Sequence, residues 1–466
     1  MKNTKHQLSF FSFYDFPTIE KHLSEMALEG WMLKSAEGTV WKYERIEPKQ
    51  LHFAVTYFPK ATALDPEPSD ELKMLWDFCE HTGWKLAVQA AQIQIFYNES
   101  ENPRPIETDP VAQIENIHRA AKKSILVNFW LGLLLGIMNL GLFAYQLFTY
   151  PVDTLANASR LCSGCMWSLY LISTTAEPIA YFRWHKKAQR IALEEDRLLL
   201  PKDTRFIKNT LFILLMTVLV CMLLSLPGAG AVQGIVFGVL YMTALIVIVR
   251  TVMRYLKRRK VSAKINFTVT MLVSIAMSVA LVGVLTFAII KGTEQGFFTD
   301  SNAAGTYEHD GMVWEYYDDE LPLTIEDLTG EQYESYSYHC TEDKTIFLTK
   351  TECRQNPRYD ADNFKELPDI EYTIITANIP GIFTTIKNAV INERQDEIHG
   401  DYIFTDHYEA IDATPWGADE AYQLHWSDSV LNKYLLVWDE RIAEITFYSW
   451  EPTPEQMAVV ANKLTK

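Results

Sequence analysis

The chain has few cysteines and lacks the motifs of the large enzyme classes. Six cysteines in 466 residues are too few for a disulfide-dense scaffold. The sequence contains no G-x-x-x-x-G-K-[ST] phosphate loop, no H-E-x-x-H zinc motif, no G-x-S-x-G nucleophile elbow and no kinase signature set. Its 11 histidines form no pair at metal-ligand spacing on a convincing helix. We therefore expect no enzyme, no metal site and no cofactor, although a catalytic site assembled from distant residues stays open.

The net charge of −17 hides three regions of different character. Residues 1–117 carry 11 Lys and Arg against 18 Asp and Glu, residues 118–290 carry 19 against 6, and residues 291–466 carry 12 against 35. The regional net charges are therefore −7, +13 and −23. A basic, apolar middle between two acidic ends excludes a single globular domain, and an aromatic content of 13% excludes a disordered chain.

The middle region contains apolar stretches that are long enough to cross a membrane, which takes about 20 residues per helix. Five spans are predicted, at residues 124–148, 161–182, 206–226, 230–249 and 265–290. The second is the most polar, so we expect it to face other helices rather than lipid. Buried helices of a soluble core are the alternative, but the first, third and fifth stretches lack a polar face.

Lysine and arginine positions predict the orientation of the spans, because cytoplasmic loops carry an excess of both. Three cations precede the first span, and seven lie in each of the connections between spans two and three and between spans four and five. The other two connections hold one cation and none. Residues 1–117 are therefore expected in the cytoplasm and residues 291–466 outside, since five spans place them on opposite sides. Residues 1–16 contain no apolar stretch of a signal peptide.

The N-terminal region contains an internal echo. A helix predicted over residues 15–29 is followed by Gly30-Trp31, and a second helix, capped by Ser69, is followed by Gly83-Trp84. Strands are predicted to begin at both tryptophans and to cover residues 39–45, 51–58 and 92–97. We expect a small α+β domain with two helices on one antiparallel sheet, and interpret the tryptophans as core anchors rather than ligand platforms.

These residues carry a resemblance to a known family. The strings Phe13-Tyr14-Asp15-Phe16, Trp41-Lys42-Tyr43-Glu44 and Cys79-Glu80-His81-Thr82-Gly83-Trp84, with the L-x-x-M-A-x-x-G-W pattern of residues 23–31, are similar to the DUF2812 family over about residues 10–100. Members are typically membrane proteins of Gram-positive bacteria, and their genes often neighbour PadR-type regulators. The resemblance implies a bacterial membrane protein tied to a regulatory circuit. The family has no assigned activity, so no catalytic residue carries over.

The C-terminal region is expected to form an acidic, extracytoplasmic α+β domain. Strands are predicted over residues 312–317, 345–349, 371–376, 401–405, 421–426, 433–438 and 441–449. The last two form a hairpin through Asp439-Glu440, and Thr453 begins a final helix with a capping box. Cys340 and Cys353 are a candidate disulfide, with two free thiols as the alternative. The clustered acids fit no EF-hand pattern and are interpreted as a solvated face.

Polar and small residues mark two candidate features inside the membrane. Glu177 is a functional candidate because an intramembrane carboxylate is costly, and the alternative is an interfacial ion pair with Arg183 or Lys186. Two G-x-x-x-G pairs are predicted to pack helices, within the bundle or between copies: Gly132 and Gly136, and Gly234 and Gly238. Cys162 and Cys165 are interpreted as small interface residues rather than a redox C-x-x-C motif.

The predicted fold class is a multi-pass α-helical membrane protein of five spans with a small cytoplasmic and a larger extracytoplasmic α+β domain. Its expected function is regulatory or sensory, coupling the outer domain to the cytoplasmic one. A non-catalytic accessory subunit of an exporter or envelope-assembly machine is the alternative. A small transporter or membrane enzyme is less favoured, because the spans lack inverted-repeat symmetry. The expected partners are the lipid bilayer and a membrane or cytoplasmic protein, without direct nucleic-acid binding.

Overall fold

The computed structural model describes residues 3–36, 38–225, 228–294, 302–392, 397–399, 402–404, 406–426 and 429–465. The chain divides into two compact units, each built from segments far apart in the sequence. The first unit comprises Met1–Asn139, Met166–Val218 and Phe237–Gly283, and the second comprises Leu140–Cys165, Leu219–Val236 and Val284–Lys466. Both units therefore include parts of the helical region, residues 118–290, which is predicted from the sequence to be a separate part of the chain.

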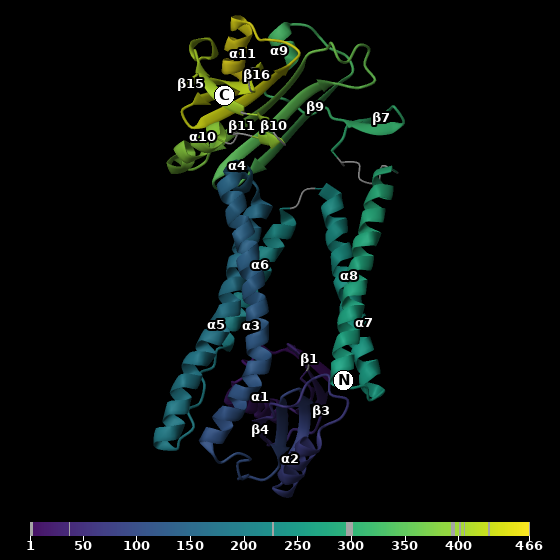
Figure 1. Cartoon of the computed structure of the whole chain (residues 1–466), viewed down its shortest axis with the longest axis vertical. Helices are drawn as coiled ribbons and strands as arrows, with labels where there is room; N and C mark the ends of the chain where they lie inside the picture. Colours follow the sequence, from purple (N-terminus) through teal and green to yellow (C-terminus); the bar gives the residue numbers. More distant parts are fainter. Residues whose placement is uncertain are drawn as a thin grey trace. The chain divides into compact units, whose positions relative to one another are not determined.

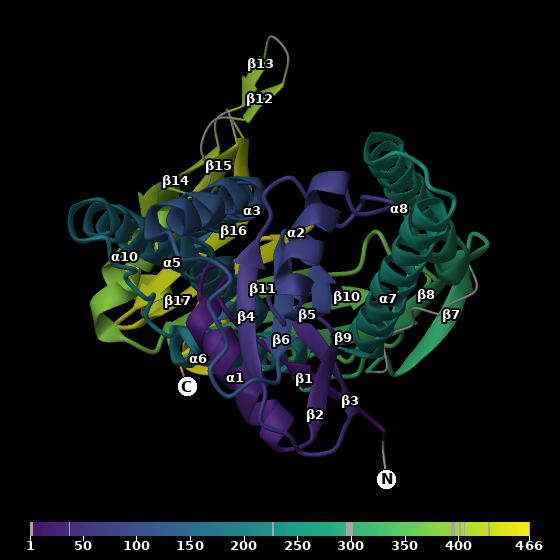
Figure 2. The same cartoon turned by 90° about the horizontal axis from the view of Figure 1, so that it is seen from below.

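Two copies of one strand–helix–strand–strand arrangement form the N-terminal domain of the first unit. The first copy is β1 (Thr4–Leu8), α1 (Phe16–Leu28), β2 (Trp31–Ser35) and β3 (Val40–Arg45), and the second is β4 (His52–Tyr57), α2 (Asp70–His81), β5 (Lys85–Ala90) and β6 (Ile93–Asn98). Each copy forms its own antiparallel sheet, in the orders β1-β3-β2 and β4-β6-β5 (Figure 2). The predicted single sheet is wrong, because the last strand of each copy pairs with both other strands of that copy.

The two copies have the same backbone features at the positions where their sequences are similar. Gly30 and Gly83 follow their helices with φ of +83° and +87°, a left-handed conformation that glycine adopts at little cost. The register of each second strand shifts at the same place, just after Leu33 in β2 and just after Leu86 in β5. The predicted cap is confirmed, since the Ser69 side chain accepts a hydrogen bond from the backbone of the first turn of α2. The internal echo therefore corresponds to a repeated structural unit.

Six helices follow the N-terminal domain. They are α3 (Pro110–Thr149), α4 (Pro151–Ala156), α5 (Ala158–Glu195), α6 (Arg205–Leu224), α7 (Gly228–Arg258) and α8 (Ala263–Glu294). Among the described residues, four segments are long and apolar enough to cross a membrane: Asn128–Thr149, Arg205–Leu224, Gly238–Arg258 and Ala263–Phe287. They correspond to the first, third, fourth and fifth predicted spans. The second predicted span lies in α5, which is too polar to qualify by composition alone.

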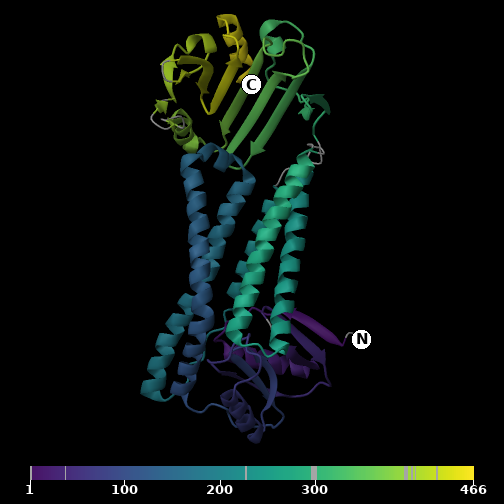
Figure 3. The ribbon, with the colours of Figure 1, turned by 45° about the vertical axis from the view of Figure 1, so that its right-hand side comes forward.

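A seven-stranded antiparallel sheet dominates the C-terminal domain of the second unit (Figure 3). Its strands, in spatial order, are β14 (Asp406–Ile411), β15 (Glu420–Trp426), β16 (Ser429–Trp438), β17 (Arg441–Tyr448), β11 (Asp369–Ala377), β10 (Leu348–Pro357) and β9 (Tyr336–Lys344). The other elements are β7 (Gly305–His309), β8 (Met312–Tyr316), α9 (Ile325–Thr329), α10 (Phe383–Asn392), β12 (Glu397–His399), β13 (Tyr402–Phe404), α11 (Pro454–Leu464) and the 3-10 turns Pro380–Ile382 and Thr414–Trp416. The predicted hairpin through Asp439-Glu440 and the Thr453 capping box are confirmed. Strand β9 and most of β10 lie outside the predicted strands.

Both faces of this sheet are buried, because helices cover each of them. Successive strand residues point to opposite faces, so Leu435 and Leu436 belong to different cores. One core includes Val460 of α11 and residues of α9. The other includes residues of α10 and Val152 of α4, which is 6% exposed. The connection between α3 and α5, which the sequence marked only by its single cation, is therefore a structural part of the C-terminal domain.

Candidate functional site

A cavity of about 1070 Å³ lies within the first unit, where the N-terminal domain meets α3, α5, α6 and α7. The domain contributes residues 9–14, which precede α1, and residues 89–93 of the β5–β6 turn. Aromatic rings line it from both sides: Phe10 of the domain and Phe212 of α6 lie with ring centroids 4.9 Å apart. Its size and apolar lining are typical of a site for a small organic ligand.

An ion pair between two helices supplies charge to the cavity wall. Lys208 Nζ of α6 lies 2.7 Å from Glu177 Oε1 of α5, and both side chains are half-buried. Arg250 and Lys257 of α7 also line the cavity, and Lys257 Nζ lies 3.5 Å from the backbone oxygen of Ala63. Glu177 is the single acidic side chain among the described lining residues, so three cations face one carboxylate.

The partner of Glu177 differs from both predicted partners. Arg183 and Lys186 follow Glu177 by six and nine residues, which places them about 240° and 180° around the helix. Residues three or four positions apart share a face of a helix, whereas these do not. Helix α6 instead returns alongside α5 and brings Lys208 to the carboxylate. The tertiary arrangement, rather than sequence proximity, determines the pair.

We expect Lys208→Met to destabilise the protein by about 1–3 kcal/mol, because it leaves a half-buried carboxylate without its cation. The double variant Glu177→Gln with Lys208→Met removes both charges and is expected to recover part of that loss. The measurement is the apparent melting temperature of the full-length chain in nanodiscs. Equal melting temperatures for Lys208→Met and the wild-type chain would show that the pair contributes nothing to stability.

The first predicted glycine pair lies where α3 contacts α5, and the two helices run side by side (Figure 1). A Cβ atom at Gly132 would lie 2.7 Å from Thr174 Cγ2, and one at Gly136 would lie 3.0 Å from Leu171 Cδ1. Only a residue without a side chain allows this approach. The same contact continues at Gly164 of α5, where a Cβ would lie 2.5 Å from the Phe143 ring. Gly164 is not among the predicted packing residues, although a small residue in the most polar span is a signal that could have identified it.

The second glycine pair makes no such contact in the part of the chain that the structure describes. A Cβ atom at Gly238 would have no atom within 4 Å. The surroundings of Gly234 lie outside the described residues. Packing at this pair, within the bundle or between copies, stays a prediction.

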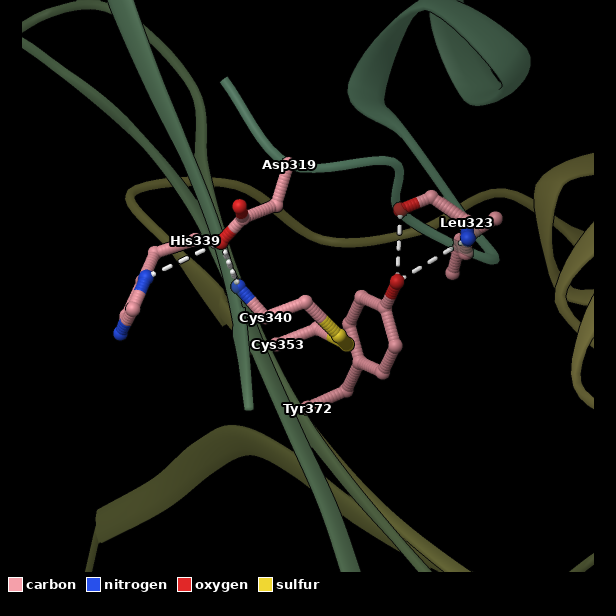
Figure 4. Close-up of a disulfide and its surroundings, with 6 residues drawn as sticks. All are labelled: Asp319, Leu323, His339, Cys340, Cys353 and Tyr372. Atoms are coloured by element: carbon pink, nitrogen blue, oxygen red, sulfur yellow. Dashed lines mark hydrogen bonds and ion pairs between the residues drawn. A yellow bond between two sulfur atoms is a disulfide. The ribbon is translucent and has the colours of Figure 1, made fainter. Parts of the chain in front are cut away.

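Cys340 and Cys353 form a disulfide between neighbouring strands (Figure 4). They are register partners in β9 and β10, with their Cα atoms 4.1 Å apart. Cys353 is buried beside Tyr372 in the core. The backbone N–H of Cys340 donates to Asp319 Oδ2 at 2.9 Å, and His339 Nδ1 lies 3.2 Å from the same oxygen. The disulfide thus ties two strands that already pair.

A half-buried carboxyl group in the N-terminal domain has a pKa raised toward neutral pH. Glu20 of α1 accepts a hydrogen bond from the backbone N–H of Val55 at 2.9 Å, and burial raises the pKa of Glu20 to about 7. The folded domain therefore keeps this proton at pH values where the unfolded chain, with its ordinary pKa near 4.5, has lost it. Stability contributed by Glu20 is greatest below pH 4.5 and declines as the pH rises to about 7.

We expect Glu20→Gln to stabilise the protein at pH 8, by as much as about 3 kcal/mol, and to change little at pH 5. Glutamine keeps the acceptor for Val55 but does not ionise. The measurement is the apparent melting temperature of the full-length chain at both pH values, with Glu80→Gln on the exposed surface of α2 as the control. A gain at pH 5 equal to the gain at pH 8 would contradict the ionisation argument.

The comparison with known proteins places the N-terminal part of the chain. Residues 15–130 match the family described as protein of unknown function (DUF2812). No curated protein and no solved structure matches the chain. The matched segment runs from α1 through strands β2 to β6 into α3, and so includes Ile114 and Ile117, which are buried in the core of the N-terminal domain. The match confirms the predicted resemblance to the DUF2812 family over residues 15–130.

Proposed function

We propose that the chain is a bacterial membrane protein of regulatory or sensory type, in which an outer domain is coupled to the cytoplasmic DUF2812 domain through α3 and α5. One observation carries the proposal: this helix pair and its connection contribute to the cores of both domains. Ile117 of α3 and Ala188 of α5 are fully buried in the N-terminal core. Val152 and Ala156 of α4, the connection between these helices, are buried in the C-terminal core.

Helix α4 is well suited to transmit a displacement. A single residue separates it from α3 and another single residue separates it from α5. Polar contacts hold it to the sheet: Lys350 Nζ of β10 lies 2.6 Å from Asp153 Oδ1, and Thr345 Oγ1 donates to the backbone oxygen of Leu155 at 2.5 Å. A shift of the sheet would therefore move α4 and both attached helices.

The proposed topology has five spans, with α5 as the second. Its polar composition is compatible with crossing, because Thr174 and Leu171 face the glycines of α3 and Gly164 faces Phe143. Helix α5 runs antiparallel to the apolar segment of α3. If that segment of α3 crosses the membrane, α5 crosses it as well. The placement of lysines and arginines supports a cytoplasmic N-terminal domain. The disulfide supports an oxidising environment for the C-terminal domain.

Cysteine accessibility tests this topology. Glu80→Cys and Glu334→Cys place exposed thiols in the N-terminal and C-terminal domains, in a chain whose four free cysteines are replaced. A membrane-impermeant maleimide is expected to label Glu334→Cys in intact protoplasts, and Glu80→Cys only after permeabilisation. Equal labelling of both in intact protoplasts would place both domains on one side and would exclude a fifth span.

Hydrogen exchange of the full-length chain in nanodiscs tests the coupling. Lys350→Ala releases Asp153 of α4, and Val152→Asp disrupts the same helix from its buried face. Both are expected to increase exchange at residues 110–121 and 181–192, where α3 and α5 join the N-terminal core. Arg354→Ala is the matched control, because it breaks a pair of the same strand with Asp369 without touching α4. If exchange increases in α4 but stays unchanged in those two segments, the coupling is refuted.

One observation supports the accessory-subunit alternative: no atom of the described residues lies within 4 Å of a Cβ built at Gly238 on α7. A helix of another membrane protein fits against such a surface. Purification in a gentle detergent followed by mass spectrometry separates the two functions. A stoichiometric membrane partner would favour the accessory role.

A further inference from the structure

We propose that the cavity of the first unit binds an anionic phospholipid drawn from the surrounding membrane. The acyl part would lie among the apolar side chains of α3, α6 and α7, and the headgroup would lie near Arg250 and Lys257. This inference goes beyond the proposed function, because a bound lipid and a coupling of the two domains do not require one another.

The apolar wall belongs to segments with membrane composition. The large apolar side chains that α3, α6 and α7 contribute are Phe129, Ile207, Leu211, Phe212, Leu215 and Met253. They come from three of the four apolar segments. The facing wall comes from the N-terminal domain, which is composed like a water-soluble protein. A molecule in this cavity therefore contacts apolar helices on one side and a polar domain on the other. Such surroundings suit an amphiphile, which has an apolar and a polar part.

The charge in the cavity selects an anion. Lys208 is neutralised by Glu177 at 2.7 Å, which leaves Arg250 and Lys257 without an acidic side chain among the described lining residues. Among the described residues, the polar contact of Lys257 is with the backbone oxygen of Ala63, at 3.5 Å. Lys260, in the turn just after α7, differs because its Nζ lies 2.6 Å from Glu67 Oε1. Two cations at the end of an apolar helix attract the negative headgroups of a membrane.

The volume separates a lipid from other anions. At about 1070 Å³ the cavity is slightly larger than most small-molecule sites, which measure about 300–1,000 Å³. A small inorganic anion would leave most of the apolar lining uncovered, and a zwitterionic lipid would bring no net negative charge to the two cations. An anionic phospholipid can cover the apolar wall with its acyl chains and pair its negative headgroup with the two cations.

Native mass spectrometry of the full-length chain, titrated with phosphatidylglycerol or phosphatidylcholine, tests the proposal. We expect one tightly retained phosphatidylglycerol. The double variant Arg250→Gln with Lys257→Gln is expected to weaken its binding about 30-fold, or about fivefold for each cation. The matched control is Arg258→Gln with Arg259→Gln, which removes the same charge from exposed residues of the same region that do not line the cavity. The control is expected to bind like the wild-type chain.

Two further variants keep the test independent of folding defects. Arg250→Lys with Lys257→Arg preserves the charge and is expected to preserve binding, whereas Ala176→Phe fills the cavity without a change of charge and is expected to abolish it. Equal affinity for phosphatidylcholine, or an equal loss in the control variant, would overturn the proposal. Displacement of the lipid by excess inorganic phosphate would show that the site takes a soluble anion instead.

Discussion

Replacing Gly132 by leucine is expected to push α3 away from α5 and to lower the stability of the protein by about 3 kcal/mol or more. The position has no room, since even a Cβ atom would lie 2.7 Å from Thr174 Cγ2 and 3.1 Å from the Tyr170 hydroxyl. Overpacking a tight contact commonly costs about 1–3 kcal/mol, and here a long branched side chain enters between two helix backbones. The measurement is the apparent melting temperature of the full-length chain in nanodiscs.

Gly141→Leu provides the control, because it makes the same change in the same helix. A Cβ atom at Gly141 would meet nothing within 4 Å. Its melting temperature is expected to equal or exceed that of the wild-type chain, since leucine favours helix more than glycine does. A similar loss for both variants would mean that glycine matters for α3 itself rather than for its contact with α5.

Replacing Val152 by aspartate is expected to destabilise the C-terminal domain by about 3–5 kcal/mol. Val152 is 6% exposed and packs in the core that α4 shares with α10 and one face of the large sheet. A carboxylate there loses its hydration without gaining a cation. For a domain of this size the melting temperature is expected to fall by about 10 °C or more, measured by scanning calorimetry of the full-length chain.

Tyr150→Asp is the control for this prediction. It introduces the same carboxylate two residues earlier, at an exposed position just before the first turn of α4. Aspartate is a favoured residue at the N-cap of a helix, so no loss of stability is expected. If Val152→Asp leaves the calorimetric transition of the C-terminal domain unchanged, α4 is not part of that domain's core, and the proposed coupling loses its basis.

Local sequence signals predicted much of the N-terminal domain. Gly30 and Gly83 marked the ends of α1 and α2, and Ser69 marked the start of α2. These features act within a few residues, so their effect on the backbone can be derived without the rest of the fold. The number of sheets could not be derived in this way. Which strand edges pair depends on hydrogen bonds between residues far apart in the chain, and the alternation of side chains leaves the partners undefined.

The candidate site shows the same limit more strongly. Glu177 was singled out because a carboxylate in an apolar stretch is rare, but its partner Lys208 lies 31 residues away. The described lining of the cavity comes from eight separate segments of the chain, none of which carries a recognisable ligand-binding motif. Gly132 and Gly136 were identified as a packing motif, but the sequence did not show that the surface they contact belongs to α5. Sequence reasoning thus identified unusual residues but not their neighbours.

The sequence by itself determined the apolar helices, the basic and acidic regions and the DUF2812 resemblance, because composition, charge and short motifs depend only on residues close together along the chain. Only the tertiary structure decided that α4 belongs to the C-terminal core and that a cavity forms beside α5. It also decided that the strands of each small sheet all come from one copy of the repeated unit. These features arise from packing between distant segments, and packing is set by the shapes of surfaces that do not exist until the chain has folded.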